Sequence, residues 1–573
     1  MVTYKLKIAT GTEERAGTIV QVSIVLVGVE GESAKLQLPH KWSNFIRGAV
    51  TDFDVIMEKD LGDLLLVRIS TEQYKTFNMD AWYCRYVDVT SPSGQLYQFP
   101  FYQWICGPMT VEIPEGKGEI EFVMKMKGFA TCKASWTDIE DIRFLYSLYK
   151  SEYSDVVAEL WKEDDFFGSQ YLIGVNPTLI RKCSKIPENF PVGDNMVAAS
   201  LGTTTSLQKE LEDGNIFLAD YKILQGVPAN KSVNGKQQYM VAPMCLLWKN
   251  PEDQLVPIAI QLAQSPGENA PIFLPSDSES DWLLAKIWVR NSEFQVHQVD
   301  SHLLRTHLFA EVFNIATTRQ LPMSHPVYKL ITPHLLYTLE INVIARMKLI
   351  GPGGYFDQSI VTGKGGIPIL LKKAMDGVTT RAHFVSNIIH YYYKSDEAVS
   401  EDPELQAWVA EIFKEGFLEN TSSGVPSSLE TKASLIKYLT MVIFTCSAQH
   451  AAVNKGQFDF YSWMPNSPTS MKSPPPTAKG ISTMQTILEA LPDVNVVSVA
   501  IFVVWLLSRD SEDSRRLGHY PDVRFTEKSP LQSIEDFKKK LLEISKSITD
   551  RNKSMYFPYT YLDPKMIENG III

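Results

Sequence analysis

Five histidines lie close together in the middle of the chain, and their spacing raises the question of a metal site. They are His297, His302, His307, His325 and His334. His302 and His307 are five residues apart, so on a regular α-helix their side chains would point about 140° apart. They can bind one metal ion only if the helix widens locally, as a π-bulge allows. Without that widening they are ordinary buried histidines, and the spacing leaves both interpretations open.

His450 and Asn454 form a second candidate pair. A separation of four residues places both side chains on the same face of a helix, about 40° apart. The pair follows the apolar run 439–446, so we expect it on a buried helix. A buried imidazole beside a buried amide needs partners. A metal ion and ordinary hydrogen bonds both meet that need.

The sequence finishes with three isoleucines, Ile571, Ile572 and Ile573. A frayed tail or a simple hydrophobic plug would account for them. The alternative is that they insert the tail into the protein. A buried terminal carboxylate would then require a cation beside it.

The elements that must hold these groups fall into two parts, beginning with a β-rich segment over residues 1–113. Tyr4, Leu6 and Ile8 alternate with lysines, and strand-like runs at 63–69 and 82–89 are separated by turn signals. Short strands with frequent turns predict an antiparallel β-sandwich. The Pro- and Gly-rich stretch 114–118 then marks a domain boundary.

Residues 119–573 are predicted to form a large, mainly α-helical domain. Apolar residues recur at helical spacing in 281–290, 302–318, 335–349, 388–393, 429–448 and 534–548. We expect Ser533 to be the N-cap of the last of these helices. The apolar run 494–507 is shorter than the roughly 18–20 residues that span a bilayer, so it predicts a buried core helix.

Composition excludes several classes of protein. Of 573 residues, 45% are hydrophobic and 21% charged, as in an ordinary globular protein. The chain has 55 basic and 66 acidic residues, a net charge of −11, so we expect no nucleic-acid binding. Its six cysteines form no C-x-x-C motif, which argues for a reducing compartment. The start of the chain lacks a signal-peptide pattern, so we expect a cytoplasmic protein.

These features together resemble the animal lipoxygenases. The match runs through 282–291, 302–307, 450–454, 456–457, 558–563 and the terminal isoleucine, and it covers nearly the whole chain. The closest branch looks like the second type of 15-lipoxygenase and its epidermal relatives. The resemblance implies a multidomain protein in which a PLAT-like, C2-like membrane-binding sandwich precedes the helical catalytic domain.

The resemblance also implies an iron-dependent dioxygenase. Its ligands to one non-haem iron would be His302, His307, His450, Asn454 and the carboxylate of Ile573. Nitrogen and oxygen ligands without thiolate suit such iron, and Gln457 would orient groups around it. The enzyme would take a bis-allylic hydrogen from an arachidonate-like polyunsaturated fatty acid, or its ester, and add O2 to give a hydroperoxide.

The resemblance also assigns individual residues of this chain to a substrate channel. Ala345 matches the position that controls stereochemistry, where alanine usually accompanies S products, and Leu349 matches the leucine behind the reacting pentadiene. Residues expected at the pocket floor are Phe294, Phe356, Ser359 and Ile360. The apolar members of this group would also fit an ordinary packed core.

In the sandwich, the resemblance bears on membrane and calcium binding. Trp42, Phe77 and Trp104 lie in or next to predicted turns and would insert into a membrane surface, although ordinary half-buried aromatics explain them equally well. Asp80 matches a calcium-binding region of the family. However, loop 16–20 lacks the expected acidic residues, and Ile46 stands where related modules often carry an acidic residue. Calcium needs oxygen ligands, so we expect a weakened or absent site.

Three departures from the family pattern bear on activity. Ile344 stands where some members have a basic residue for the substrate carboxylate, which favours entry of the methyl end first or a substrate without a free acid. The chain is shortened between 118–122 and 125–129 and again within 375–384. Loss of pocket wall admits water and loosens substrate placement. A catalytically weak lipid- or membrane-binding protein therefore stays open as an alternative. A hydroperoxide isomerase of the same family also stays open, because it would use the same ligands.

Overall fold

The computed structural model describes most of the chain and folds it into two compact units, Met1–Lys133 and Ala134–Ile573. The described residues are 2–12, 16–39, 43–72, 81–106, 110–114, 136–146, 151–230, 236–351, 355–356, 360, 384–508 and 514–572. The predicted domain boundary at 114–118 falls almost wholly outside them, so the boundaries stay a prediction.

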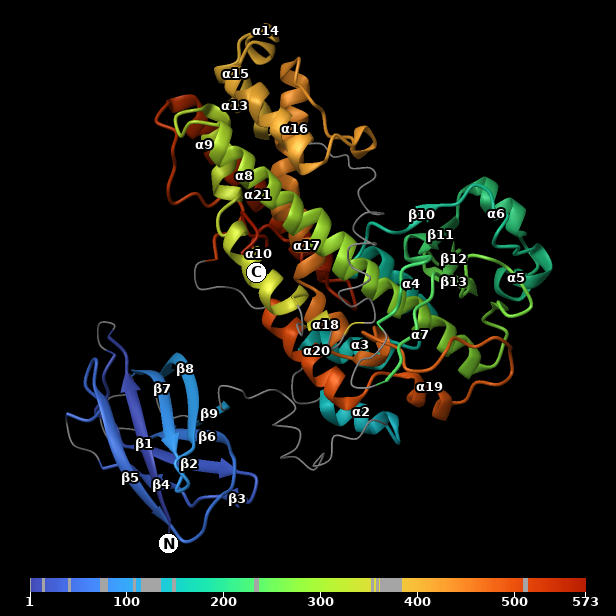
Figure 1. The fold of residues 1–573 in the computed structure, drawn as a ribbon. Coiled ribbons are helices and arrows are strands. Elements are labelled where there is room, and N and C mark those ends of the chain that lie inside the picture. The colour runs from blue at the N-terminus through green and yellow to red at the C-terminus, as the bar shows by residue number, and fades with distance from the viewer. Residues whose placement is uncertain are drawn as a thin grey trace. The chain divides into compact units, whose positions relative to one another are not determined.

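The first unit is a sandwich of two antiparallel sheets (Figure 1), as predicted. One sheet has the order β5-β1-β7-β8, and the other β3-β2-β6-β9 with β4 beside β2. The strands are β1 (Val2–Thr10), β2 (Val22–Gly28), β3 (Gly31–Glu32), β4 (Leu36–Gln37), β5 (Val50–Met57), β6 (Leu64–Thr71), β7 (Ala81–Thr90), β8 (Leu96–Cys106) and β9 (Thr110–Pro114). Tyr4, Leu6 and Ile8 are buried while the lysines between them are exposed, because successive side chains of a strand point to opposite faces.

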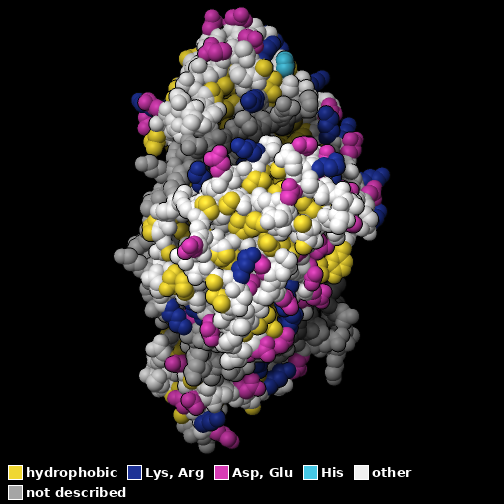
Figure 2. Space-filling view, turned by 90° about the vertical axis from the view of Figure 1, so that its right-hand side faces the viewer, with side chains coloured by type: hydrophobic (Ala, Val, Ile, Leu, Met, Phe, Trp, Pro, Cys, Tyr) yellow, Lys and Arg dark blue, Asp and Glu magenta, His cyan; other side chains and the backbone are white. Residues whose placement is uncertain are grey.

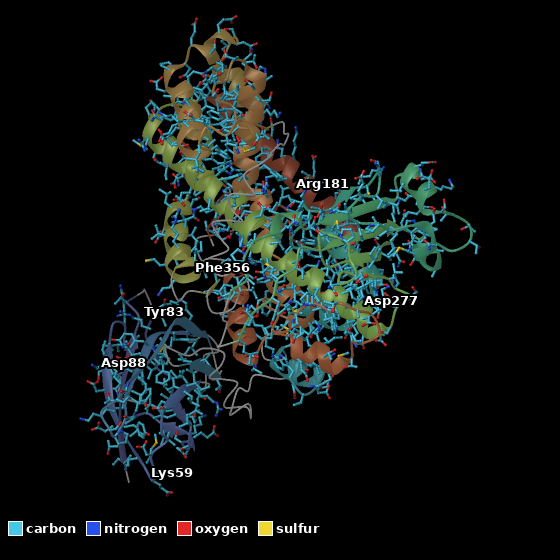
Figure 3. The ribbon with its side chains drawn as sticks, turned by 45° about the vertical axis from the view of Figure 1, so that its right-hand side comes forward. Lys59, Tyr83, Asp88, Arg181, Asp277 and Phe356 are labelled. Atoms are coloured by element: carbon cyan, nitrogen blue, oxygen red, sulfur yellow. The ribbon has the colours of Figure 1, made fainter. Side chains whose placement is uncertain are left out.

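Trp104 lies within strand β8 rather than in a turn. It stands opposite Tyr83 of β7, which is labelled in Figure 3, and the two rings meet edge to face with centroids 5.3 Å apart. The Trp104 side chain is 40% exposed. Trp42, Phe77 and Asp80 lie outside the described residues, so their predicted roles stay predictions.

The second unit combines a five-stranded antiparallel sheet with many helices (Figure 1). The sheet is β10 (Arg181–Lys182), β11 (Ile216–Asp220), β12 (Met244–Lys249), β13 (Leu255–Gln261) and β14 (Ile272–Phe273), in that order. The described α-helices up to residue 400 are α2 (Ile139–Tyr146), α3 (Glu152–Leu160), α4 (Asp164–Ile173), α5 (Asp194–Leu201), α6 (Leu207–Asp213), α7 (Glu279–Val296), α8 (Phe309–Gln320), α9 (Pro326–Ile331), α10 (Thr338–Ala345), α13 (Phe384–Tyr392) and α14 (Glu397–Ser400).

The later α-helices complete the same unit. They are α15 (Pro403–Glu411), α16 (Lys432–Phe444), α17 (His450–Asn454), α18 (Gln457–Tyr461), α19 (Met484–Ala490), α20 (Val494–Leu507) and α21 (Lys528–Asn552). In the part of the chain that the structure describes, four π-helical segments continue α-helices: η2 (His297–Leu308), η4 (Arg346–Ile350), η5 (Ile412–Gly416) and η7 (Thr445–Gln449). The predicted mainly helical character of this unit is confirmed.

Helices α7, η2 and α8 run end to end as one long helix through the second unit (Figure 1). Every residue over 281–296 is buried, so polar side chains there need partners inside the protein. Lys286 forms an ion pair with Asp164 at 2.6 Å, and Tyr221 donates a hydrogen bond to Glu293 at 2.6 Å. The helix is therefore held on all sides and forms a fixed support for the residues on η2.

The last long helix begins earlier than we predicted. Its N-cap is Glu527 and its first residue is Lys528. Ser533 lies inside it and donates a hydrogen bond to the Ser529 carbonyl at 3.0 Å, so the prediction of Ser533 as N-cap is wrong. Pro530 does not stop the helix because the N–H groups of a first turn have no partner within the helix.

The apolar run 494–507 forms helix α20, whose side chains at Val497, Ile501 and Val504 are buried, as predicted. Within the part of the chain that the structure describes, no helix combines the length and apolar character needed to cross a bilayer. Figure 2 shows hydrophobic side chains scattered among acidic and basic ones on one face. Such scattering is normal on protein surfaces.

Candidate metal centre and substrate cavity

Three histidines from two helices meet in the interior of the second unit. His302 and His307 lie on η2, and His450 begins α17, which packs against η2. One ring nitrogen of each lies within 4.8 Å of those of the other two, and each residue is at most 6% exposed. Over the described ranges, this is the only group of three or more histidine, cysteine or acidic side chains placed to share a metal ion.

The π-helical geometry of η2 is what brings His302 and His307 together. Hydrogen bonds from residue i to i+5 place residues five apart on one face of such a helix. The two Nε2 atoms are 3.2 Å apart. Nitrogens at that separation can share one ion at ordinary metal–nitrogen distances of about 2.1 Å. The widening on which the sequence argument depended is therefore present.

The state of these imidazoles suits metal binding. Burial lowers the pKa of His302 well below its ordinary value, and the nearby His307 and His450 lower it further. Burial also lowers the pKa of His307 to about 4. A neutral imidazole has a free nitrogen lone pair, which a metal ligand requires. The donor set therefore fits a transition-metal ion.

Asn342 determines which nitrogen of His307 faces the cluster. Its Oδ1 accepts a hydrogen bond from Nδ1 of His307 at 2.9 Å, which leaves Nε2 for a metal. Its Nδ2 donates to the His307 carbonyl at 2.8 Å and to Glu311 at 2.7 Å. Glu311 in turn pairs with Arg346 at 2.7 Å. Partners of this kind fix the tautomer and orientation of a metal-binding histidine.

A second chain of hydrogen bonds reaches Asn454. Gln457 donates to Oδ1 of Asn454 at 2.8 Å, and Gln298 of η2 donates to Oε1 of Gln457 at 2.7 Å. Asn454 itself donates to the carbonyl of Leu507 at 3.2 Å. Gln457 thus connects a predicted iron ligand to Gln298, which supports the orienting role expected of it.

The other three histidines of the sequence cluster lie outside the metal group. Nε2 of His297 is 2.7 Å from the Val453 carbonyl, so this histidine ties η2 to α17. His325 accepts a hydrogen bond at the N-terminus of α9. His334 is hydrogen-bonded to the C-terminal tail through Asn569. Of the five clustered histidines, only His302 and His307, the two that were proposed as ligands, belong to the group of three.

The C-terminal tail is inserted into the second unit. Glu568 and Asn569 are buried, and Ile571 is fully buried in the same hydrophobic core as Leu330 and Phe525. A frayed tail is excluded over these residues. Ile573 lies outside the described residues, so its carboxylate stays a predicted ligand.

Gly456 lies where the motif at 456–457 packs against the motif at 558–563. A Cβ atom at Gly456 would lie 3.2 Å from the ring of Tyr561 and 3.2 Å from Val175. The hydroxyl of Tyr561 donates to Asp459 at 2.6 Å. Glycine therefore allows the helix that begins at Gln457 to pack closely against the segment near the C-terminus.

An apolar cavity of about 320 Å³ opens onto the histidine cluster. Besides His302 and His307, its lining residues are Gln298, Leu303, Ile341, Ile344, Ala345, Lys348, Leu349, Ile350, Phe356, Leu506 and Leu507. Ile341, Ala345 and Leu349 recur at every fourth residue along α10 and η4, so one face of this helix forms a wall. A mostly apolar pocket with a few polar groups is typical of a site for an apolar ligand.

The cavity wall includes three of the predicted channel residues, Ala345, Leu349 and Phe356. Figure 3 labels Phe356 close to the end of the helix formed by α10 and η4. Phe294 is fully buried on α7, where its ring centroid lies 4.8 Å from that of Tyr461. Neither Phe294 nor the buried Ile360 belongs to the described lining. Ser359 lies outside the described residues.

Sequence reasoning missed three groups around the site: Gln298, Asn342 and Glu311. Gln298 precedes His302 by four residues, and Asn342 precedes Arg346 by four, so helical spacing was an available signal for both. Glu311 follows His307 by four residues, so the same helical spacing was available for it, but its hydrogen bond with Asn342, 31 positions away in the sequence, had no local signal.

Comparison with known proteins agrees with this geometry. The lipoxygenase family model matches residues 145–371 and 374–558, and the PLAT/LH2 domain model matches residues 4–112. The chain is 40% identical to arachidonate 12-lipoxygenase, 12R-type, of Mus musculus and 40% identical to hydroperoxide isomerase ALOXE3 of Homo sapiens. It is 41% identical to polyunsaturated fatty acid lipoxygenase ALOX15B of Homo sapiens. Each comparison covers 100% of both chains.

The comparisons also show how short this chain is. The alignment with the mouse 12R-type enzyme spans 702 positions against 573 residues here, so 129 positions have no counterpart. Among solved structures, a calcium-dependent 11R-lipoxygenase matches with a TM-score of 0.73 at 30% identity, and a coral 8R-lipoxygenase with 0.70 at 31%. Both matches cover 100% of each chain. From its fold, its buried histidine cluster and these full-length matches, the chain belongs to the lipoxygenase family of fatty-acid dioxygenases.

Proposed function

We propose that this chain binds one non-haem iron ion and converts arachidonate-like polyunsaturated fatty acids, or their esters, to hydroperoxides. The observation that carries the proposal is that an apolar cavity opens directly onto the buried histidine cluster. The proposed ligands are His302, His307, His450, Asn454 and the carboxylate of Ile573. Iron held there would supply the one-electron chemistry that removes a hydrogen atom from a bis-allylic carbon.

The cavity wall would hold the acyl chain beside the cluster. Ile341, Ala345 and Leu349 offer it apolar contacts and exclude water from the reacting carbons. The side chain of Ala345 is one methyl group, and we infer that it blocks oxygen from one end of the substrate radical. This predicts mainly an S product.

Two residues of the wall bear on the orientation of the substrate. Ile344 lines the cavity without a charge, whereas Lys348, one helical turn later, is exposed and is the only lysine or arginine of the described lining. We infer that the methyl end enters first and that the carboxylate stays near Lys348. The expected gain is small, because an exposed ion pair contributes about 0–1 kcal/mol.

A hydroperoxide isomerase is the second candidate function. The specific reason is that the chain is as similar to hydroperoxide isomerase ALOXE3 as to arachidonate 12-lipoxygenase, 12R-type, at 40% identity each. Oxygen uptake with arachidonate would favour the dioxygenase. Conversion of a fatty-acid hydroperoxide without net oxygen uptake would favour the isomerase.

The third candidate is a catalytically weak lipid- or membrane-binding protein. The 129 alignment positions that this chain lacks favour it, since lost pocket wall admits water. Contact with a membrane surface through Trp42, Phe77 and Trp104, with little or no help from calcium, belongs to this proposal and to the first. A cytoplasmic location with peripheral membrane association remains a prediction.

Product analysis after incubation with arachidonate, on protein of known iron content, tests the proposal. We expect a fatty-acid hydroperoxide in proportion to bound iron, and none from the His450→Ala variant. Iron-loaded protein that binds liposomes but transforms neither arachidonate nor a hydroperoxide would contradict both enzymatic proposals and favour the third.

A further inference from the structure

His334 is fully buried and lies outside the metal group, yet it contacts the C-terminal tail. It ends the short helix η3 (Thr332–His334), just before the helix that forms the cavity wall. Its Nδ1 lies 2.7 Å from the carbonyl oxygen of Asn569, and its Nε2 lies 3.2 Å from the hydroxyl of Tyr520. The contact with Asn569 joins residues 235 positions apart in the sequence.

The two partners determine the direction of both hydrogen bonds. A carbonyl oxygen only accepts, so Nδ1 of His334 carries the proton and donates to Asn569. Nε2 then accepts from the hydroxyl of Tyr520. A neutral imidazole satisfies both bonds, and burial lowers the pKa of His334 to about 4, which keeps the ring neutral near pH 7.

Asn569 is held by the segment 515–519 as well. Its backbone N–H donates to the Arg515 carbonyl at 2.7 Å. Its side-chain oxygen accepts from the N–H of Gly518 at 3.0 Å, and its side-chain nitrogen donates to the His519 carbonyl at 2.6 Å. With the bond from His334, both backbone and both side-chain polar groups of Asn569 are paired.

Asn569 makes the last hydrogen bonds of the described tail. Gly570 packs directly on His334, because a Cβ atom there would lie 2.7 Å from the His334 carbonyl oxygen. Ile571 is then fully buried. The terminal carboxylate is four residues beyond Asn569, a reach of at most about 14 Å. The position of Asn569 therefore limits where that carboxylate can lie.

We propose that His334 is a positioning residue, which holds the carbonyl of Asn569 and so sets the point from which the last four residues reach the metal. This inference rests on the proposed function, because it takes the carboxylate of Ile573 as an iron ligand. Metal–ligand distances tolerate only tenths of an ångström. A tail released from His334 would loosen the carboxylate and leave the three histidines in place.

The test compares His334→Leu with His334→Asn. Leucine removes the donor to Asn569, whereas the amide of asparagine can restore an N–H near the position of Nδ1. Each iron-loaded variant is challenged with a ferrous-iron chelator, and the ferric form is examined by electron paramagnetic resonance. We expect His334→Leu to lose iron about 10–100 times faster than wild type and to change the ferric spectrum. We expect His334→Asn to stay within about threefold of wild type.

His325→Leu is the matched control. It also removes a buried histidine, one paired with Asp402 at 3.1 Å, but its described contacts do not include the tail. We expect it to lower the unfolding midpoint and to leave the rate of iron loss from folded protein unchanged. Wild-type iron loss and an unchanged spectrum in folded His334→Leu would overturn the inference.

If His334→Leu fails to fold, two gentler variants decide the question. Tyr520→Phe removes the donor to Nε2, and Gly570→Ala places a methyl group against the His334 carbonyl. Faster iron loss in both supports the inference, and wild-type iron loss in both overturns it. Iron retention that depends on His334 in protein that oxidises no fatty acid would refute the proposed function alone. Normal turnover with unchanged iron loss would refute the inference alone.

Discussion

Asn342 joins η2, which carries two of the proposed metal ligands, to the helix that forms the cavity wall, so replacing it by leucine is a strong test of the proposed site. Its side chain makes three hydrogen bonds: to Nδ1 of His307, to the His307 carbonyl and to Glu311. Leucine has a similar shape and makes none of them. The ring of His307 would lose the partner that turns Nε2 towards the cluster.

The expected size of the effect follows from these contacts. Each of the three hydrogen bonds contributes about 0.5–1.5 kcal/mol net, so we expect Asn342→Leu to lower the free energy of unfolding by about 1.5–4.5 kcal/mol. Removing the partner of a metal-binding histidine typically weakens metal affinity about 10–100-fold. The variant should therefore lose iron faster even under conditions where it remains folded.

Two further variants separate orientation from stability. Asn342→Asp keeps an acceptor for Nδ1 of His307 but places a carboxylate beside Glu311. We expect it to be destabilised while retaining iron better than Asn342→Leu. Asn314→Leu is the matched control, because Asn314 donates one hydrogen bond at 2.8 Å, to the Leu335 carbonyl, away from the cluster.

The assay combines chelator challenge of iron-loaded protein with urea unfolding of the same preparations. Iron loss from Asn314→Leu should match wild type. If Asn342→Leu also keeps wild-type iron retention and unfolds within about 0.5 kcal/mol of wild type, then Asn342 does not position His307 and the reasoning fails.

His450→Ala should abolish iron binding and turnover because it removes a buried imidazole, whereas Asn454→His should retain iron. Elemental analysis of both variants checks this, and full iron content in His450→Ala would mean that the proposed site is misplaced. Deleting Ile573 moves the terminal carboxylate by about 3.3–3.6 Å of chain, so iron should be lost while circular dichroism stays unchanged; normal iron content would rule out a terminal ligand. Ala345→Gly should add an R product at a second carbon, seen by chiral chromatography, and an active variant with unchanged products would contradict the stereochemical role. The folded-state pKa of His334, about 4 against an ordinary 6.5, means that the unfolded chain binds the proton first as pH falls. This contribution to stability is therefore full above pH 6.5 and declines towards pH 4, by about 2 kcal/mol between pH 7 and pH 5. Urea unfolding at both pH values should show a smaller decline in His334→Asn, and equal declines would contradict this.

Local pattern was enough to predict the sandwich. The alternation of Tyr4, Leu6 and Ile8 with lysines places one face of β1 inside, and the structure buries that face. The strand predicted at 82–89 is found as β7 within one residue at each end. Such agreement is expected because a sheet with one buried face imposes a period of two on its own sequence.

The sequence pattern predicted the positions of helices correctly, but it did not predict where they begin and end. Ser533 has the residue type and position of an N-cap, yet α21 begins at Lys528. An N-cap signal is local and weak, contributing about 1 kcal/mol. Packing along the whole helix outweighs it, as the buried Pro530 and Ile534 indicate.

At the proposed metal centre, spacing alone identified His450 and Asn454 as residues of one helix face, since four residues make about one turn. For His302 and His307, spacing showed only that the helix must widen locally for both to reach one metal ion. The structure has this widening as the π-helix η2. The partners of these residues come from far along the chain, such as Asn342 at 35 positions from His307. Side chains that meet across such distances leave no periodic trace in the sequence, because their contact depends on how whole helices pack. Only the tertiary structure therefore places the histidines around one point, gives them their partners and anchors the tail through Asn569 and the buried Ile571.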